Sequence, residues 1–135
     1  MKFGTQVIHA EKFHDLVAGA HISPIYQSST FTFDCLDKAI LRNQQYDQEK
    51  GFTYARFGTP TTHELEKKIA CLEHAESGIA LSSGMAAIST ALLTALKSGD
   101  HVIAGKVIYG CTFTMFMDVF QEYGIEVSLV DMANL

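Results

Sequence analysis

Basic residues are scarce in this chain of 135 residues, which has 10 Lys and Arg against 15 Asp and Glu and a formal net charge of −5. Proteins that bind nucleic acid or acidic membrane surfaces normally carry a basic cluster, and the sequence contains none. No apolar run approaches the length of a membrane span, because Ser, Thr or Gly interrupts the longest run every few residues. We therefore expect neither a nucleic-acid partner nor a membrane partner.

Cysteine is also rare. The three cysteines, Cys35, Cys71 and Cys111, are odd in number and far apart, which argues against a disulfide framework and indicates a reducing compartment. Residues 1–6 lack the apolar core of a signal peptide, so we expect a cytoplasmic protein. The six histidines show no paired spacing typical of metal ligands, and no metal site is predicted.

Residues 1–50 lack the pattern of a domain core. Residues 5–9 fit a helical turn or a short strand, and residues 24–33 alternate polar and apolar side chains as an extended segment does. One short helix is predicted within residues 34–48. Such an arm either lies on another surface or forms a meandering surface segment of the same domain.

From residue 51 onward, strand and helix patterns alternate. A capping box, Thr61-x-x-Glu64, predicts that the first helix begins there. The following elements are predicted to be a buried strand (79–81), a helix (85–96), a strand (101–104), a helix (112–123) and a strand (126–131). This order predicts an α/β fold with a parallel sheet. Three strands and two or three helices would not cover both faces of such a sheet, so we expect residues 51–135 to be the first, incomplete part of a domain.

The helix over residues 112–123 is predicted to bury one apolar face, formed by Phe113, Phe116, Met117 and Phe120.

The junction Ser82-Ser83-Gly84-Met85 is a candidate anion site. The amino terminus of a helix presents unpaired N–H groups and the positive end of the helix dipole, which suit a phosphate or carboxylate. Gly84 has no Cβ, so the backbone can approach an anion closely. An ordinary strand-to-helix turn with Ser83 as N-cap is the other interpretation.

Two further segments carry candidate residues. Ligands of parallel α/β sheets bind at the carboxyl ends of strands, where Tyr109 is predicted to lie. Its ring could stack on a flat ligand and its hydroxyl could transfer a proton, or it could merely cover the sheet edge. Tyr54 and Arg56 are predicted to share one side of an extended segment, and a charge-assisted bond from arginine to phosphate contributes about 1.5–3 kcal/mol. A surface ion pair of Arg56 with a carboxylate is the alternative.

Four blocks of the sequence resemble the Cys/Met-metabolism enzymes, the pyridoxal-phosphate enzymes of transsulfuration. In chain order, these blocks are Pro24–Phe31, Tyr54–Thr61, Ser82–Ile88 and Tyr109–Thr112. The resemblance covers essentially the whole chain. It implies a fold type I domain (aspartate-aminotransferase-like), pyridoxal 5'-phosphate as cofactor, and a homo-oligomer, a dimer of dimers, that shares each cofactor site between subunits. Residues 1–50 would then be an arm that contacts another subunit.

The resemblance also implies roles for the candidate residues. Gly84 and Met85 match the backbone amides that hold the cofactor phosphate, and Ser83 beside them is counted with the cofactor-binding residues. Tyr54 and Arg56 match the pair that reaches this phosphate from the neighbouring subunit.

Tyr109 matches the tyrosine that stacks on the pyridine ring and assists proton transfer, and Cys111 is predicted to be catalytic with it. Cys111 falls where methionine γ-lyases carry cysteine and several relatives carry glycine. This favours α,γ-elimination of methionine, which gives methanethiol, ammonia and 2-oxobutanoate. Cystathionine γ-synthase, cystathionine γ-lyase or O-acetylhomoserine sulfhydrylase activity is the alternative. Thr59 departs from the family, which usually has asparagine before Pro60.

The family's Schiff-base lysine has no counterpart here, because its expected position lies beyond Leu135. Lys106 is nearest to the predicted crevice, but we expect it to face solvent. The chain is thus predicted to be the amino-terminal part of such an enzyme and to be inactive alone. The alternative is a non-catalytic remnant that binds a phosphorylated ligand or a full-length subunit.

Overall fold

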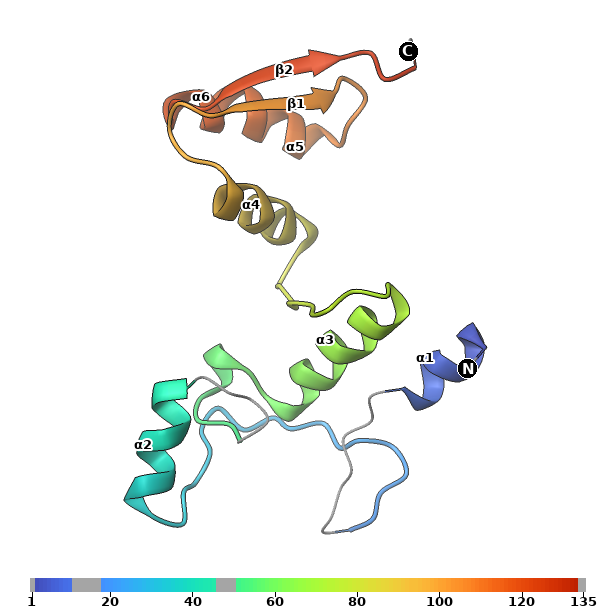
Figure 1. Cartoon of the computed structure of the whole chain (residues 1–135), viewed down its shortest axis with the longest axis vertical. Coiled ribbons are helices and arrows are strands. Elements are labelled where there is room, and N and C mark those ends of the chain that lie inside the picture. The colour runs from blue at the N-terminus through green and yellow to red at the C-terminus, as the bar shows by residue number, and fades with distance from the viewer. Residues whose placement is uncertain (1, 11–17, 46–50, 134–135) are drawn as a thin grey trace. The chain divides into compact units, whose positions relative to one another are not determined.

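The computed structural model describes residues 2–10, 18–45 and 51–133 (Figure 1). The chain forms two compact units, Met1–Ala80 and Leu81–Leu135, each of which is considered by itself below. Within the described ranges, no helix is long and apolar enough to cross a membrane.

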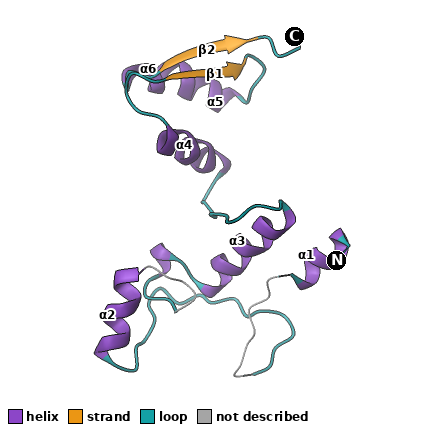
Figure 2. Cartoon of the chain, in the orientation of Figure 1, coloured by secondary structure: helices purple, strands orange, loops and turns teal. Residues whose placement is uncertain are grey.

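The first unit consists of helices joined by loops and extended segments (Figure 2). Its elements are α1 (Phe3–His9), α2 (Leu36–Gln45), the short 3-10 helix η2 (Ala55–Phe57) and α3 (Pro60–Leu72). The helical interpretation of residues 5–9 is confirmed by α1, and α2 lies within the predicted range 34–48. Within the predicted extended range 24–33, Thr30 forms an isolated antiparallel bridge with Tyr54, but no strand is formed.

The start of α3 differs from the prediction. Its N-cap is Thr59, whose hydroxyl accepts the N–H of Thr62 at 3.2 Å, while the Thr62 hydroxyl accepts the N–H of Thr59 at 2.9 Å. This is a capping box two residues earlier than the predicted pair of Thr61 and Glu64. The earlier start is favoured because Pro60 then occupies the first helical position, where its fixed φ suits the helix and its missing N–H costs nothing.

The predicted buried strand at residues 79–81 was wrong. Ile79 is 78% exposed and Leu81 is 42% exposed. A strand exists only through hydrogen bonds to a neighbouring strand. The N–H of Ala80 donates instead to the carboxylate of Glu66 at 2.8 Å, and no strand among the described residues pairs with this segment.

The second unit contains a parallel pair of strands and the helices that accompany it. Its elements are α4 (Gly84–Ala95), β1 (His101–Gly105), α5 (Gly110–Thr114), the π-helical turn η3 (Met115–Val119), α6 (Phe120–Glu122) and β2 (Glu126–Val130). The pairing of β1 with β2 is parallel and aligns His101 with Glu126 and Gly105 with Val130. The predicted strand–helix–strand order over residues 101–131 is thereby confirmed.

The core of this unit lies between the helices and the strands. Its buried residues are Met115, Phe116, Phe120 and Ile125. Phe113 was predicted to be buried but is 43% exposed, whereas Met115 is only 8% exposed. Phe116 and Phe120 are buried as predicted, and Met115 joins them in place of Phe113 because the π-helical turn breaks the 3.6-residue period.

Candidate functional site

The amino terminus of α4 is capped by Ser83. The Ser83 hydroxyl accepts the N–H of Ala86 at 3.1 Å, which confirms that Ser83 is an N-cap. The first N–H groups of a helix have no acceptor within the helix, so this cap leaves those of Gly84 and Met85 available to another acceptor. A Cβ built on Gly84 would meet no atom within 4 Å, so the space beside this residue is open.

A contact between two side chains joins α4 and α5 at their amino ends. The hydroxyl of the buried Thr112 donates to the Sδ of Met85 at 3.6 Å. Met85 directly follows Gly84, and Thr112 lies three residues after Tyr109. The junction Ser82–Met85 and the segment that begins at Tyr109 therefore meet at the same end of the second unit.

Tyr109 and Cys111 interact directly. Tyr109 is the residue before α5 and is 66% exposed, and Cys111 is also exposed. Hydrogen bonding with the Cys111 side chain raises the pKa of Tyr109, and the electrostatic interaction with the same side chain and slight desolvation act in the same direction.

The carboxyl ends of β1 and β2 are linked by an ion pair that sequence reasoning missed. The Lys106 side chain is 53% exposed, in keeping with the solvent-facing prediction, but its ammonium group hydrogen-bonds to the carboxylate of Asp131. This bond, followed by one from the N–H of Ala133, lowers the pKa of Asp131. Each residue directly follows one strand, but only the register of the two strands shows that they are neighbours.

In the first unit, Arg56 lies against aromatic rings. Its Cζ is 5.4 Å from the ring centroid of Tyr54 and 5.3 Å from that of Phe57. No carboxylate in the described part of the chain forms an ion pair with Arg56, so the surface pair considered as an alternative is not found there. The predicted extended geometry was wrong, because Ala55–Phe57 forms a 3-10 turn. Sequence reasoning also missed Phe57, although its adjacency to Arg56 was a usable signal.

Hydrogen bonds from the arm hold this turn from one side. The N–H of Ala55 donates to the carbonyl of Ser29 at 2.9 Å, and the N–H of Phe31 donates to the carbonyl of Thr53 at 3.2 Å. Gly58 ends the turn with a φ of 139°, a conformation that residues with a side chain rarely adopt. The backbone around Arg56 is therefore fixed on both sides.

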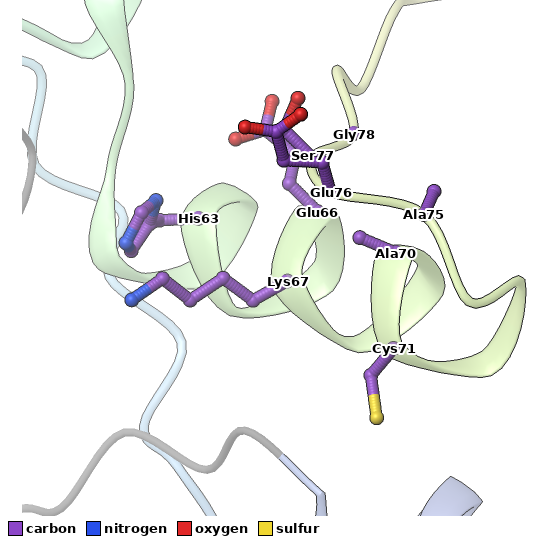
Figure 3. A pocket seen from close by; sticks show the side chains of 9 residues that line it. All are labelled: His63, Glu66, Lys67, Ala70, Cys71, Ala75, Glu76, Ser77 and Gly78. Carbon is purple, nitrogen blue, oxygen red and sulfur yellow. The ribbon is translucent and has the colours of Figure 1, made fainter.

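A separate hollow of about 420 Å³ lies along α3 (Figure 3). Its lining mixes acidic, basic and small residues: His63, Glu66, Lys67, Ala70, Cys71, Ala75, Glu76, Ser77 and Gly78. The predicted site residues do not line it. Among the residues that the structure describes, no group of three or more His, Cys, Asp or Glu side chains could hold a metal ion.

Comparison with known proteins identifies the class to which this fold and these residues belong. The sequence profile of the family described as "Cys/Met metabolism PLP-dependent enzyme" matches residues 4–135. The chain therefore belongs to this family of pyridoxal-phosphate-dependent enzymes, as the sequence predicted.

Individual relatives support the same assignment. The chain is 48% identical over 132 residues to the L-methionine gamma-lyase of Fusobacterium nucleatum subsp. nucleatum, covering 98% of this chain and 33% of that protein. It is 41% identical over 130 residues to the cystathionine beta-lyase MetC of Bacillus subtilis, covering 96% of this chain and 30% of that protein.

Solved structures of the family have the same fold. A Campylobacter jejuni protein described as an O-acetylhomoserine (thiol)-lyase superposes with a TM-score of 0.88 at 33% identity, covering 99% of this chain and 32% of that one. That structure carries a pyridoxyl-lysine phosphate. The α/β fold type I class and pyridoxal phosphate as cofactor are thus confirmed. The chain spans about a third of the length of these relatives.

The residues of this chain fit the phosphate group of that cofactor. The open N–H groups of Gly84 and Met85 are donors suited to an anion, and they lie at the positive end of a helix of 12 residues. Arg56 is a cation that no carboxylate of the described residues neutralises. Both features match a dianionic group better than a neutral ligand.

Proposed function

We propose that this chain forms the phosphate-binding part of a pyridoxal-phosphate enzyme that eliminates the γ-substituent of methionine. The products would be methanethiol, ammonia and 2-oxobutanoate. The observation that carries this proposal is Cys111, an exposed cysteine two residues after Tyr109 whose side chain raises the pKa of Tyr109 at the amino end of α5. The identity with an L-methionine gamma-lyase over nearly the whole chain supports the same reaction.

The phosphate is held by two sets of donors in this proposal. The N–H groups of Gly84 and Met85 bind it at the start of α4, and Ser83 keeps that helix end in place through its cap. Tyr54 and Arg56 contribute from a neighbouring subunit, with the guanidinium supplying the balancing charge. A bond between arginine and phosphate stabilises such a complex by about 1.5–3 kcal/mol, more than the roughly 0.3–1 kcal/mol of a helix dipole.

Tyr109 and Cys111 act on the substrate side. When bound, pyridoxal phosphate supplies the electron sink that amino-acid elimination requires. Tyr109 would stack on the ring, and its hydroxyl would hold a proton at neutral pH, as an ordinary phenol does. The proton would go to the departing sulfur of the substrate. Cys111 orients the Tyr109 hydroxyl through their hydrogen bond.

The oligomer and the domain division belong to the same proposal. A dimer of dimers lets the arm, residues 1–50, contact another subunit while residues 51–135 begin the cofactor-binding domain. The hydrogen bonds between residues 29–31 and 53–55 support a role for the arm in placing Tyr54 and Arg56. We place the enzyme in the cytoplasm, in keeping with its free cysteines.

The test is a comparison of substrates with the full-length protein. The 2-oxo acid product is measured from methionine (2-oxobutanoate) and from cystathionine (2-oxobutanoate after γ-elimination, pyruvate after β-elimination), and homocysteine is measured from O-acetylhomoserine with sulfide. The highest kcat/KM is expected with methionine. A higher value with cystathionine or O-acetylhomoserine would replace this reaction with one of its relatives, for which the similarity to a cystathionine beta-lyase is the specific support. Failure to turn over any of them with cofactor bound would favour a non-catalytic remnant.

A matched variant tests the role of Cys111. Cys111→Gly is expected to lower kcat/KM for methionine several-fold relative to cystathionine, while Cys35→Gly, at the other exposed cysteine, leaves the ratio unchanged. An unchanged ratio in both variants would remove Cys111 from the argument for methionine.

A further inference from the structure

Phe57 is an aromatic residue without a role in the proposed function, although its ring contacts Arg56. The Arg56 Cζ lies 5.3 Å from the centroid of this ring, as close as it lies to Tyr54. Phe57 is 49% exposed, so it is not held at this position as a member of a buried core.

The backbone determines that the two aromatic residues flank Arg56. In the 3-10 turn η2, the N–H of Phe57 donates to the carbonyl of Tyr54 at 2.9 Å, and the N–H of Gly58 donates to the carbonyl of Ala55 at 3.1 Å. These bonds bring the backbones of Tyr54 and Phe57 close together in space, and Arg56 lies between the two residues in sequence.

An aromatic ring can hold a guanidinium without using its N–H groups. The attraction is between the positive charge and the ring face, and both distances are within the range of about 6 Å at which it operates. A carboxylate would occupy the N–H groups and cancel the charge, whereas a ring leaves them available to an anion. Restricting an exposed arginine in advance also reduces the conformational entropy that it loses on binding.

We propose that Phe57 is a positioning residue of the phosphate site: its ring, together with that of Tyr54, holds the Arg56 guanidinium ready for the cofactor phosphate. This inference rests on the proposed role of Arg56 in binding that phosphate. It adds a residue that acts through Arg56 and does not itself touch the anion.

The test measures anion affinity in the full-length protein after its cofactor has been removed. The dissociation constants of pyridoxal phosphate and inorganic phosphate are determined by titration for the wild type, Phe57→Leu and Phe57→Tyr. Exposed cation–π contacts correspond to about a two- to fivefold change in affinity. Phe57→Leu is expected to weaken both ligands by this factor, and Phe57→Tyr, which keeps the ring face, to bind as the wild type does. Equal weakening in both variants would overturn the proposal.

A double-mutant cycle separates positioning from a general effect on folding. If Phe57 acts through Arg56, Phe57→Leu should have no effect in the Arg56→Ala background. A loss that persists in that background would show that Phe57 acts otherwise and would overturn the inference. Because each comparison is made within one background, a lowered thermal stability of Phe57→Leu does not obscure the result.

The same data distinguish the positioning role of Phe57 from the proposed phosphate-binding role of Arg56. Arg56→Ala is expected to weaken both ligands at least tenfold. If Arg56→Ala binds both as the wild type does, the phosphate role of Arg56 fails and the inference fails with it. If Arg56→Ala binds weakly and Phe57→Leu binds normally, only the role of Phe57 is overturned.

Discussion

The hydroxyl of Thr112 donates to the Sδ of Met85, and this contact joins the amino ends of α4 and α5. Thr112 is only 8% exposed, so the contact belongs to the packed part of the second unit. The side chain of Met85 is thus used for packing, and its N–H is left for a ligand. One residue serves both the core and the candidate anion site.

Gly84→Ala should weaken cofactor binding without unfolding the protein. A Cβ at this position meets no protein atom within 4 Å, so the substitution is compatible with the fold, but the methyl group would stand in the approach to the helix end. We expect the dissociation constant of pyridoxal phosphate to rise about tenfold, corresponding to roughly 1.4 kcal/mol. Gly4→Ala, another helical glycine with open space around it, is the control and should bind normally. Normal binding by Gly84→Ala would argue against the anion site.

Cys111→Ala should lower the pKa of Tyr109. The hydrogen bond with Cys111 is the largest cause of the raised value, so its removal should move the pKa back towards that of an ordinary tyrosine. In linkage terms, a raised folded-state pKa means that the stability contributed by Tyr109 is present below its unfolded pKa and is lost as pH rises through the folded value. The measurement is an NMR titration of the labelled tyrosine ring. Cys35→Ala should leave Tyr109 unchanged, and an unchanged Tyr109 in Cys111→Ala would contradict the assignment.

Lys106→Met should raise the pKa of Asp131. The hydrogen bond from Lys106 holds this pKa below its ordinary value, so the stability that the carboxylate contributes is present above its unfolded pKa. It is lost as pH falls through the lower folded value. The wild type should therefore exceed Lys106→Met in stability at neutral pH, and the difference should shrink in acid. Lys38→Met, which removes the similar partner of Asp34, should leave the pKa of Asp131 unaffected, as followed by carboxyl NMR.

Thr59→Ala should destabilise the protein through the start of α3. The lost hydroxyl caps Thr62, and removal of such a cap costs about 1 kcal/mol. Thr59→Asn should cost much less, because asparagine is an equally good N-cap. Thermal unfolding of the two variants provides the comparison. Equal loss in both would mean that side-chain packing around Thr59 matters more than the cap.

The sequence predicted the elements that local patterns define. The N-cap at Ser83, α2 and the alternation of β1, helix and β2 could all be predicted, since caps, apolar period and chain order suffice for them. The predicted strand at 79–81 failed because three apolar residues do not specify a partner, and Glu66 takes the N–H of Ala80.

Local sequence patterns identified only some of the candidate residues. Tyr54, Arg56, Gly84 and Tyr109 were identified from residue type and family resemblance. Phe57 and Asp131 were missed. The only local signal for Phe57 was its adjacency to Arg56, and the pairing of Asp131 with Lys106 depends on a strand register that no local pattern encodes. Contacts across elements therefore account for most of what the sequence did not reveal.

Gly58 has a consequence for how natural variants of this protein should be interpreted. It is the single residue between the turn that carries Arg56 and the cap that starts α3, and its φ of 139° strains any residue with a side chain. A replacement there would disturb both the turn at Arg56, which we propose binds the phosphate, and the start of α3. Both defects would then have one cause, the changed backbone torsion at residue 58, although Arg56 and Thr59 themselves were unaltered.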